Sequence, residues 1–130
     1  PDSKPGSQSY PVYVDATCYP DTGDFIAVVG NEPSEKLSCQ VTEGMRSSEP
    51  SLPVEKLIVP GSGAEFVEVR LSDHSPFWEH GIPAIMITDT AFFRNPNYHK
   101  ASDTLGTLDL EFIRDITRAL AGFLQRFLTN

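Results

Sequence analysis

Two segments of the sequence place a histidine beside carboxylates. They are SDHSPFWE at residues 72–79 and RNPNYHKASDT at residues 94–104. A neutral imidazole is a good zinc ligand, and a carboxylate that accepts a hydrogen bond from its other nitrogen fixes the tautomer and orientation of the ring. For His99, either Asp103 or Asp73 would supply that acceptor. On spacing alone a solvated or structural histidine is the commoner outcome, and the same holds for His74.

Short apolar runs predict the strands that must position these two loops. FIAVV at residues 25–29 predicts a buried strand and VEKLIV at residues 54–59 a second one. The alternation in residues 65–71 allows a further short strand. PAIMIT at residues 83–88 is a continuous apolar run, which is typical of a central strand buried on both faces. Ligands of α/β folds bind where such strands end and loops begin.

Two helices are predicted from apolar residues that recur at helical spacing. Leu37, Val41 and Met45 lie four residues apart, which places them on one face of a helix that Asn31 or Ser34 would cap. The last helix starts near residue 109, with Thr107 or Asp109 as its cap. Its apolar stripe comprises Leu110, Ile113, Ile116, Leu120, Phe123, Leu124 and Phe127.

The order of these elements predicts the fold class. Strands that alternate with helices favour an α/β fold, here a three-layer sandwich with a mostly parallel mixed sheet. Residues 1–23 are rich in Pro, Gly, Ser and Asp and are expected to form an irregular lead-in loop. Loops of that length are uncommon in compact domains, so the domain is expected to be incomplete at its N-terminus.

Composition excludes several classes of partner. The chain has 130 residues, a net charge of −8 and a pI of about 4.7. Nucleic acids and anionic membranes bind through clustered Lys and Arg, so neither is an expected partner. No apolar stretch approaches the roughly 20 residues that span a bilayer. The sequence leaves open whether Cys18 and Cys39 form a disulfide.

The run SDHSPFWEHGIPAIMITDTAFFRNPNYHKASDTLGTLD at residues 72–109 resembles the C-terminal signature of the two-zinc aminopeptidases. That family includes bacterial secreted aminopeptidases and, more distantly, glutaminyl cyclases and glutamate carboxypeptidase. The similarity extends backward through DTGDFIAVVGN at residues 21–31 and LPVEKLIVPG at residues 52–61. The resemblance implies that residues 1–130 form the C-terminal segment of a single zinc-peptidase domain. It also favours a secreted or periplasmic location.

The resemblance assigns roles to particular residues. The histidine of the NYHKASDT loop, here His99, is implied to bind one of two zinc ions. Asp73, His74 and Asp103 are implied to surround the metals or the substrate. For Asp73 the alternative is a structural role as the cap of a short helix that has Pro76 in its first turn.

Four aromatic residues are candidates for the substrate side of the site. Phe77, Phe92 and Phe93 would line a pocket for an apolar substrate side chain, and Tyr98 precedes the proposed ligand directly. Ordinary core packing is the alternative role for the three phenylalanines.

The remaining ligands of the family are expected upstream of residue 1. They are a His, a bridging Asp, a Glu that follows the catalytic-base Glu, and one more acidic residue. Zinc normally takes three or four protein ligands, so one histidine is not enough. The resemblance therefore implies a zinc-dependent exopeptidase that hydrolyses N-terminal peptide bonds, of which this chain carries only part of the active site. The alternatives are a non-catalytic, peptidase-like interaction module and a glutaminyl-cyclase-like acyltransferase.

Overall fold

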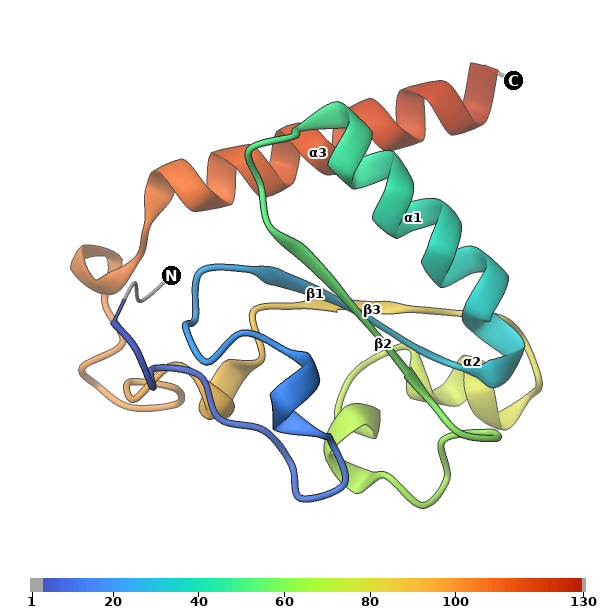
Figure 1. Cartoon of the computed structure of the whole chain (residues 1–130), viewed down its shortest axis with the longest axis horizontal. Coiled ribbons are helices and arrows are strands. Elements are labelled where there is room, and N and C mark those ends of the chain that lie inside the picture. The colour runs from blue at the N-terminus through green and yellow to red at the C-terminus, as the bar shows by residue number, and fades with distance from the viewer. Residues whose placement is uncertain (1–3, 130) are drawn as a thin grey trace.

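A three-stranded sheet forms the centre of the computed structural model, which describes residues 4–129 (Figure 1). The strands are β1 (Ile26–Asn31), β2 (Val54–Val59) and β3 (Met86–Thr88). Their order is β2-β1-β3, so β1 is central. β1 runs parallel to β2, with Ile26 opposite Val54, and antiparallel to β3, with Val28 opposite Ile87. The sheet is mixed, as expected, with one parallel and one antiparallel pair.

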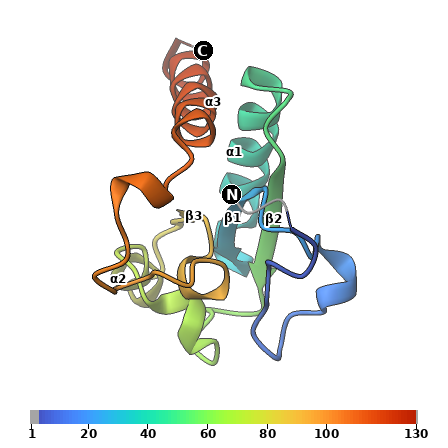
Figure 2. The same cartoon turned by 90° about the vertical axis from the view of Figure 1, so that its left-hand side faces the viewer.

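The helices and loops form a layer on each face of this sheet. The helices are α1 (Glu35–Ser48), α2 (Ser75–Glu79) and α3 (Leu110–Thr129). Short 3₁₀ turns occupy Ala16–Cys18, Glu32–Ser34, Val67–Arg70, Ala91–Phe93 and Leu105–Thr107. α1 and α3 lie on one side of the sheet, and α2 with the N-terminal segment lies on the other (Figures 1 and 2). The fold is thus the α/β three-layer arrangement, with one layer built mainly of loops.

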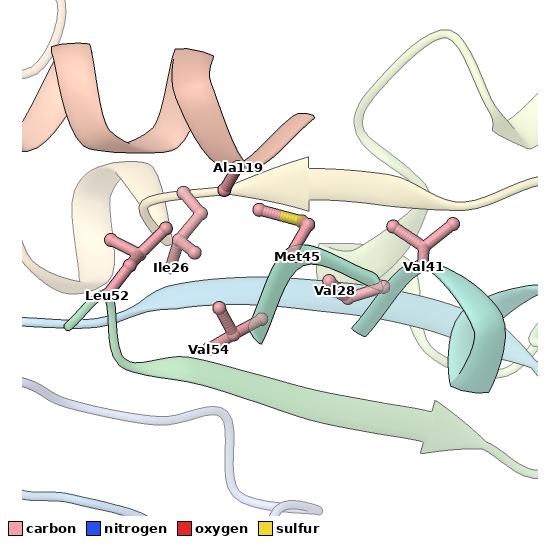
Figure 3. Packing of buried hydrophobic residues seen from close by; sticks show 7 residues of the cluster. All are labelled: Ile26, Val28, Val41, Met45, Leu52, Val54 and Ala119. Carbon is pink, nitrogen blue, oxygen red and sulfur yellow. The ribbon is translucent and has the colours of Figure 1, made fainter. Parts of the chain in front are cut away.

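The helical side of the sheet holds the larger core (Figure 3). Alternate residues of β1, Ile26 and Val28, meet Val41 and Met45 of α1, because successive side chains of a strand point to opposite faces. Ala119 of α3 completes this contact and is fully buried. The predicted helical face of α1 is therefore confirmed.

α3 packs on α1 at a point where α1 has no side chain. A Cβ atom added at Gly44 would lie 2.2 Å from Cδ2 of Phe123, so the ring rests directly on the backbone of α1. Arg126 Nη2 donates to the Gly44 carbonyl oxygen at 2.9 Å in the next turn of α3. Asp109 caps α3 as expected, since its carboxylate accepts from the Phe112 N–H at 2.9 Å. No helix within residues 4–129 combines the length and hydropathy that a membrane span needs.

The opposite face of the sheet carries a second core. It comprises Phe25 just before β1, Ala27 and Val29 of β1, Val59 of β2, Val69 and Trp78. Tyr10 and Tyr13 of the N-terminal segment pack against it. That segment, described from residue 4, is irregular apart from the turn Ala16–Cys18; residues 1–3 lie outside the described residues.

The free edge of β2 is covered by side chains. Arg46 Nε of α1 donates to the Val54 carbonyl oxygen at 3.0 Å, and the Tyr19 hydroxyl donates to the Lys56 carbonyl oxygen at 3.1 Å. Both carbonyl groups point away from β1, which pairs with the alternate residues of β2. The edge therefore offers few acceptors to a further strand.

The strand predicted at residues 65–71 is wrong, because Val67–Arg70 is a 3₁₀ turn. Phe66 and Val69 face the core from positions three residues apart, which is the repeat of a 3₁₀ helix. Val67 and Leu71 are about two-thirds exposed, at 64% and 65%. The alternation of apolar residues therefore did not reflect a strand.

The strand predicted at residues 83–88 is shorter than expected and lies at an edge. Only Met86–Thr88 pair with β1, and all three are half-buried. Pro83 has no N–H to donate. The Ala84 N–H donates to Ser34 Oγ at 3.1 Å, and the Ala84 carbonyl oxygen accepts from Trp78 Nε1 at 2.9 Å. Side chains thus take the backbone groups that a longer strand would need.

Two further local features are the N-cap of α2 and the state of the two cysteines. Asp73 does not cap α2, because the N-cap is His74 and it makes no side-chain capping bond, although Pro76 does lie in the first turn. Cys18 and Cys39 are both free thiols, so they do not form a disulfide.

Candidate functional site

The loop between β3 and α3 carries His99 on a tight turn. The Tyr98 N–H donates to the Asn95 carbonyl oxygen at 3.2 Å, and the Lys100 N–H donates to the Asn97 carbonyl oxygen at 2.9 Å. The Asn95 side chain accepts from the Asn97 N–H at 2.9 Å, which closes an Asx turn. These bonds hold the backbone on both sides of His99.

The same loop contains three residues in the left-handed backbone region. They are Thr90 with φ 71°, Ala91 with φ 47° and His99 with φ 56°. None is a glycine, and this conformation costs a non-glycine residue about 1 kcal/mol. Strained backbone of this kind gathers at functional sites, where the surrounding structure holds it in place.

The His99 side chain is exposed and rests on an aromatic neighbour. Its ring stacks on Tyr98 with centroids 3.9 Å apart and an interplanar angle of 16°. The ring centroids of Tyr98 and Phe92 lie 5.9 Å apart, and those of Phe92 and Phe93 lie 4.5 Å apart. An aromatic row therefore leads from His99 back to the turn Ala91–Phe93.

A cavity of about 140 Å³ opens beside this aromatic row. Its walls come from the N-terminal segment, the sheet face that carries the second core, the turn at Val67–Arg70 and the aromatic row itself. Phe92, Phe93 and Tyr98 line the cavity, whereas Phe77 does not. Phe77 and Phe92 are also about half exposed, at 51% and 49%, so neither is a core residue.

A polar clamp joins the aromatic turn to the N-terminal segment. Gln8 is buried, and its Oε1 accepts from Arg94 Nε at 2.8 Å. Gln8 Nε2 donates to Thr90 Oγ1 at 3.0 Å, and Arg94 Nη1 donates to the Phe25 carbonyl oxygen at 2.6 Å. The guanidinium also lies 4.5 Å above the Phe25 ring. Burial lowers the pKa of Arg94, yet the group stays charged because an arginine titrates far above neutral pH.

The neighbouring backbone strengthens this clamp. The Ser9 N–H and the Ser9 hydroxyl both donate to the Phe93 carbonyl oxygen, at 3.0 and 2.8 Å. The Tyr10 hydroxyl donates to the Pro20 carbonyl oxygen at 2.6 Å, and desolvation raises the pKa of Tyr10 to about 12. This phenol therefore remains neutral in the cavity wall.

The SDH segment leads into α2. His74 is buried, its Nε2 donates to the Val69 carbonyl oxygen at 2.6 Å, and its ring meets Trp78 edge-on at 4.5 Å. Its Nδ1 is buried without a partner, and desolvation lowers the pKa of His74. Asp73 is exposed. In the described chain no hydrogen bond or ring contact joins either residue to His99.

The carboxylates expected around His99 do not contact it in this structure. Asp103 is exposed, and its N–H donates to the Lys100 carbonyl oxygen at 3.0 Å. Residues 4–129 contain no group of three or more His, Cys, Asp and Glu side chains that could hold a metal ion. Among the described residues, the candidate site is thus one exposed imidazole near an apolar cavity.

Several residues of this region were missed in the sequence. Gln8 and Arg94 are 86 positions apart, and Tyr10 and Tyr19 lie in a stretch that the sequence predicts to be an irregular loop. The tyrosines in that Pro- and Gly-rich stretch were the available signal, since aromatic residues usually bury part of their surface.

The sequence of the chain is similar to that of a longer bacterial protein. The chain is 46% identical over 112 residues to the uncharacterized protein YfbL of Escherichia coli strain K12, a match that covers 85% of this chain and 33% of that protein. The chain therefore spans about a third of the length of this curated relative.

A solved structure shares the fold. The aminopeptidase LapA of Legionella pneumophila matches 75% of this chain, with a TM-score of 0.51 and 24% sequence identity, over 25% of its own length. At that identity the likeness concerns the fold alone, which is the zinc-exopeptidase fold expected from the sequence.

A family model matches most of the chain. The model of peptidase family M28 aligns with residues 15–124, which include β1, α1, β2, β3, the His99 loop and most of α3. With this match and the shared fold, the chain belongs to peptidase family M28.

Proposed function

We propose that this chain supplies one part of the active site of a zinc-dependent exopeptidase of the aminopeptidase type. The observation that carries the proposal is the exposed His99 imidazole, held on a strained turn inside the region that matches the peptidase family. A ligand histidine must be accessible and well oriented. The His99 side chain is exposed, and stacking on Tyr98 fixes the orientation of its ring.

The described residues do not fit a zinc ion on their own. No group of three His, Cys, Asp and Glu side chains is available within residues 4–129, whereas zinc takes three or four protein ligands. His99 therefore requires ligands from another segment. The matched region makes up 33% of the relative's length, so the relative has room for such a segment. In this proposal that segment also provides the catalytic base.

The chain's own contribution would be to bind and orient the substrate. The cavity beside the aromatic row is mostly apolar, which suits an apolar side chain of a peptide. The clamp of Gln8 and Arg94 keeps the aromatic turn against the N-terminal segment and so preserves the shape of the cavity. Asp73, His74 and Asp103 would lie around the completed site.

The second candidate function is a non-catalytic, peptidase-like module that binds peptides. The observation that favours it is the lack of a metal-ligand group among the described residues. The two candidates differ in what His99 does. It holds a metal in the first and is an ordinary surface side chain in the second.

A chimaera tests the proposal. This chain would replace the matching third of the Escherichia coli relative, and zinc content would be measured together with hydrolysis of leucine 4-nitroanilide. We expect His99→Ala to lower the zinc content and to reduce kcat/KM by more than about 100-fold, because a ligand is lost. Lys100→Ala is the matched control, since Lys100 is the exposed neighbour of His99. Full zinc content and unchanged turnover in the His99 variant would favour the non-catalytic module.

A further inference from the structure

The two cysteines of the chain sit in opposite electrostatic surroundings. Cys18 is exposed at the end of the turn Ala16–Cys18, and its Sγ donates to the Asp15 carboxylate at 3.6 Å. Cys39 is half-buried on α1, and its Sγ accepts from Lys56 Nζ at 2.9 Å. An adjacent cation stabilises a thiolate, whereas an adjacent carboxylate opposes it. Cys39 is therefore the cysteine whose sulfur is in contact with a lysine nitrogen.

The contact between Cys39 and Lys56 joins two elements of the fold. Cys39 lies in the second turn of α1, and Lys56 lies on β2, the edge strand of the sheet. Lys56 points to the helical side of the sheet, where Glu35 and Glu43 of α1 are the other charged groups that act on it. The hydrogen bond to Cys39 raises the pKa of Lys56, so the pair is an ammonium beside a sulfur.

We propose that Cys39 and Lys56 form a peroxide-responsive modification site, in which oxidation of the thiol joins the two side chains covalently. This inference concerns a site that is built from α1 and β2 and does not rest on the proposed peptidase activity.

The chemistry balances in two steps. Hydrogen peroxide oxidises the Cys39 thiol, and the products are a sulfenic acid and water. The Lys56 ammonium loses a proton to solvent, and the free amine then attacks the sulfur. The N–S bond forms as the S–O bond breaks, and the hydroxide leaves as water with a second proton from the nitrogen, which gives a sulfenamide. Relative to the reduced protein, the net change is the loss of two hydrogen atoms.

The geometry favours the reaction with Lys56 over other reactions of the sulfenic acid. The Lys56 nitrogen already touches the sulfur in the reduced protein, so little movement is needed to bring the reacting atoms together. A disulfide with Cys18 is disfavoured, because Cys18 lies in the loop layer on the other side of the sheet from α1 (Figure 1). The link would tie α1 to β2 and close a loop of 17 residues.

Mass spectrometry of the peroxide-treated chain tests the site. The Cys18→Ser variant serves as the reference, because it cannot form a disulfide within one chain. We expect the intact mass to fall by two hydrogen atoms, a digest to give one peptide that joins the segments of Cys39 and Lys56, and a thiol reductant to reverse both changes. A rise in Tm that the reductant also reverses is expected, because the link restricts the unfolded chain.

Two variants of this reference separate the roles of the pair. Lys56→Arg keeps a cation beside the sulfur, so Cys39 should still be oxidised to a sulfenic acid that dimedone traps, but no cross-link should form. Cys39→Ser should show neither change. A Cys39 that stays reduced under peroxide, or a digest without the joined peptide in the reference protein, would overturn the inference. Circular dichroism of each variant checks that the fold is intact.

Discussion

The imidazole of His99 lies flat on the phenol ring of Tyr98, with 3.9 Å between the centroids. Because both side chains are exposed, the stack is held by the turn that places His99 in the left-handed region rather than by surrounding core residues. The orientation of the proposed ligand thus depends on its immediate neighbour in the sequence.

The first prediction follows from this stack. Tyr98→Ala should remove the ring current that acts on His99 and shift its imidazole proton resonances in an NMR spectrum. Stability should fall by about 1 kcal/mol, because Tyr98 is only 37% exposed and the variant also loses the ring contact with Phe92. Tyr98→Phe is the matched control and should leave the resonances nearly in place. If the alanine variant leaves the His99 resonances unmoved, the stack does not exist in solution.

The second prediction concerns the clamp. Arg94→Ala removes the hydrogen bonds to Gln8 and to the Phe25 carbonyl oxygen, together with the cation–π contact to the Phe25 ring. We expect a loss of about 2–3 kcal/mol in the free energy of unfolding, since buried polar groups are left without partners. Urea denaturation measures it. Arg118→Ala, at an exposed position of α3, should stay within about 0.5 kcal/mol of the parent.

The third prediction concerns the contact between α1 and α3. Gly44→Ala should destabilise the chain by about 1–3 kcal/mol, because the new Cβ meets Phe123 and pushes the helices apart. The loss should appear although alanine is the better helix former. Gly106→Ala is the matched control, since the nearest atom to its Cβ lies 3.9 Å away. Adding Phe123→Leu to the Gly44 variant should recover part of the stability.

The fourth prediction concerns pH. Burial lowers the pKa of folded His74 below its ordinary value of 6.5, so between those two values the unfolded chain binds more protons than the folded one. The stability contribution of neutral His74 is therefore fully present above pH 6.5 and is lost as the pH falls toward the folded pKa.

His74→Gln isolates this effect because it retains a donor for the Val69 carbonyl oxygen. Between pH about 7.5 and about 5.5, the variant should lose less stability than the parent chain. His80→Gln is the matched control, because His80 is an exposed histidine next to the same short helix. Identical slopes for the parent and the His74 variant would contradict the prediction.

Local patterns in the sequence were sufficient for part of the fold. β2 was predicted at residues 54–59, where it occurs, and the face of α1 with Val41 and Met45 was also correct. These elements depend on side-chain periodicity, which a sequence displays directly. The predicted β3 is too long because side chains bind the backbone of Ala84. One of them, Ser34, lies 50 positions away in the sequence, and the other, Trp78, reaches back from a helix only six positions away.

The candidate site was predictable to a similar extent. The resemblance points to His99 as a metal ligand, and this role stays a prediction. Of the three phenylalanines that the sequence offers for a pocket, Phe92 and Phe93 line the cavity and Phe77 does not. The pairs Gln8–Arg94 and Cys39–Lys56 were not predicted, since nothing in a single sequence indicates which remote polar side chains meet. Such pairs become visible only when the sheet brings their elements together.

The side chains that cover the free edge of β2 have a consequence for solubility. A six-residue rim strand with open carbonyl groups is a template on which a second molecule can add its own strand, and repeated addition leads to fibrils. Arg46 and Tyr19 occupy the outward carbonyl groups of Val54 and Lys56. At the other rim only three residues are available in β3. The molecule therefore has fewer open backbone acceptors along β2 and offers only a three-residue strand at the other edge of its sheet, and both features disfavour cross-β pairing.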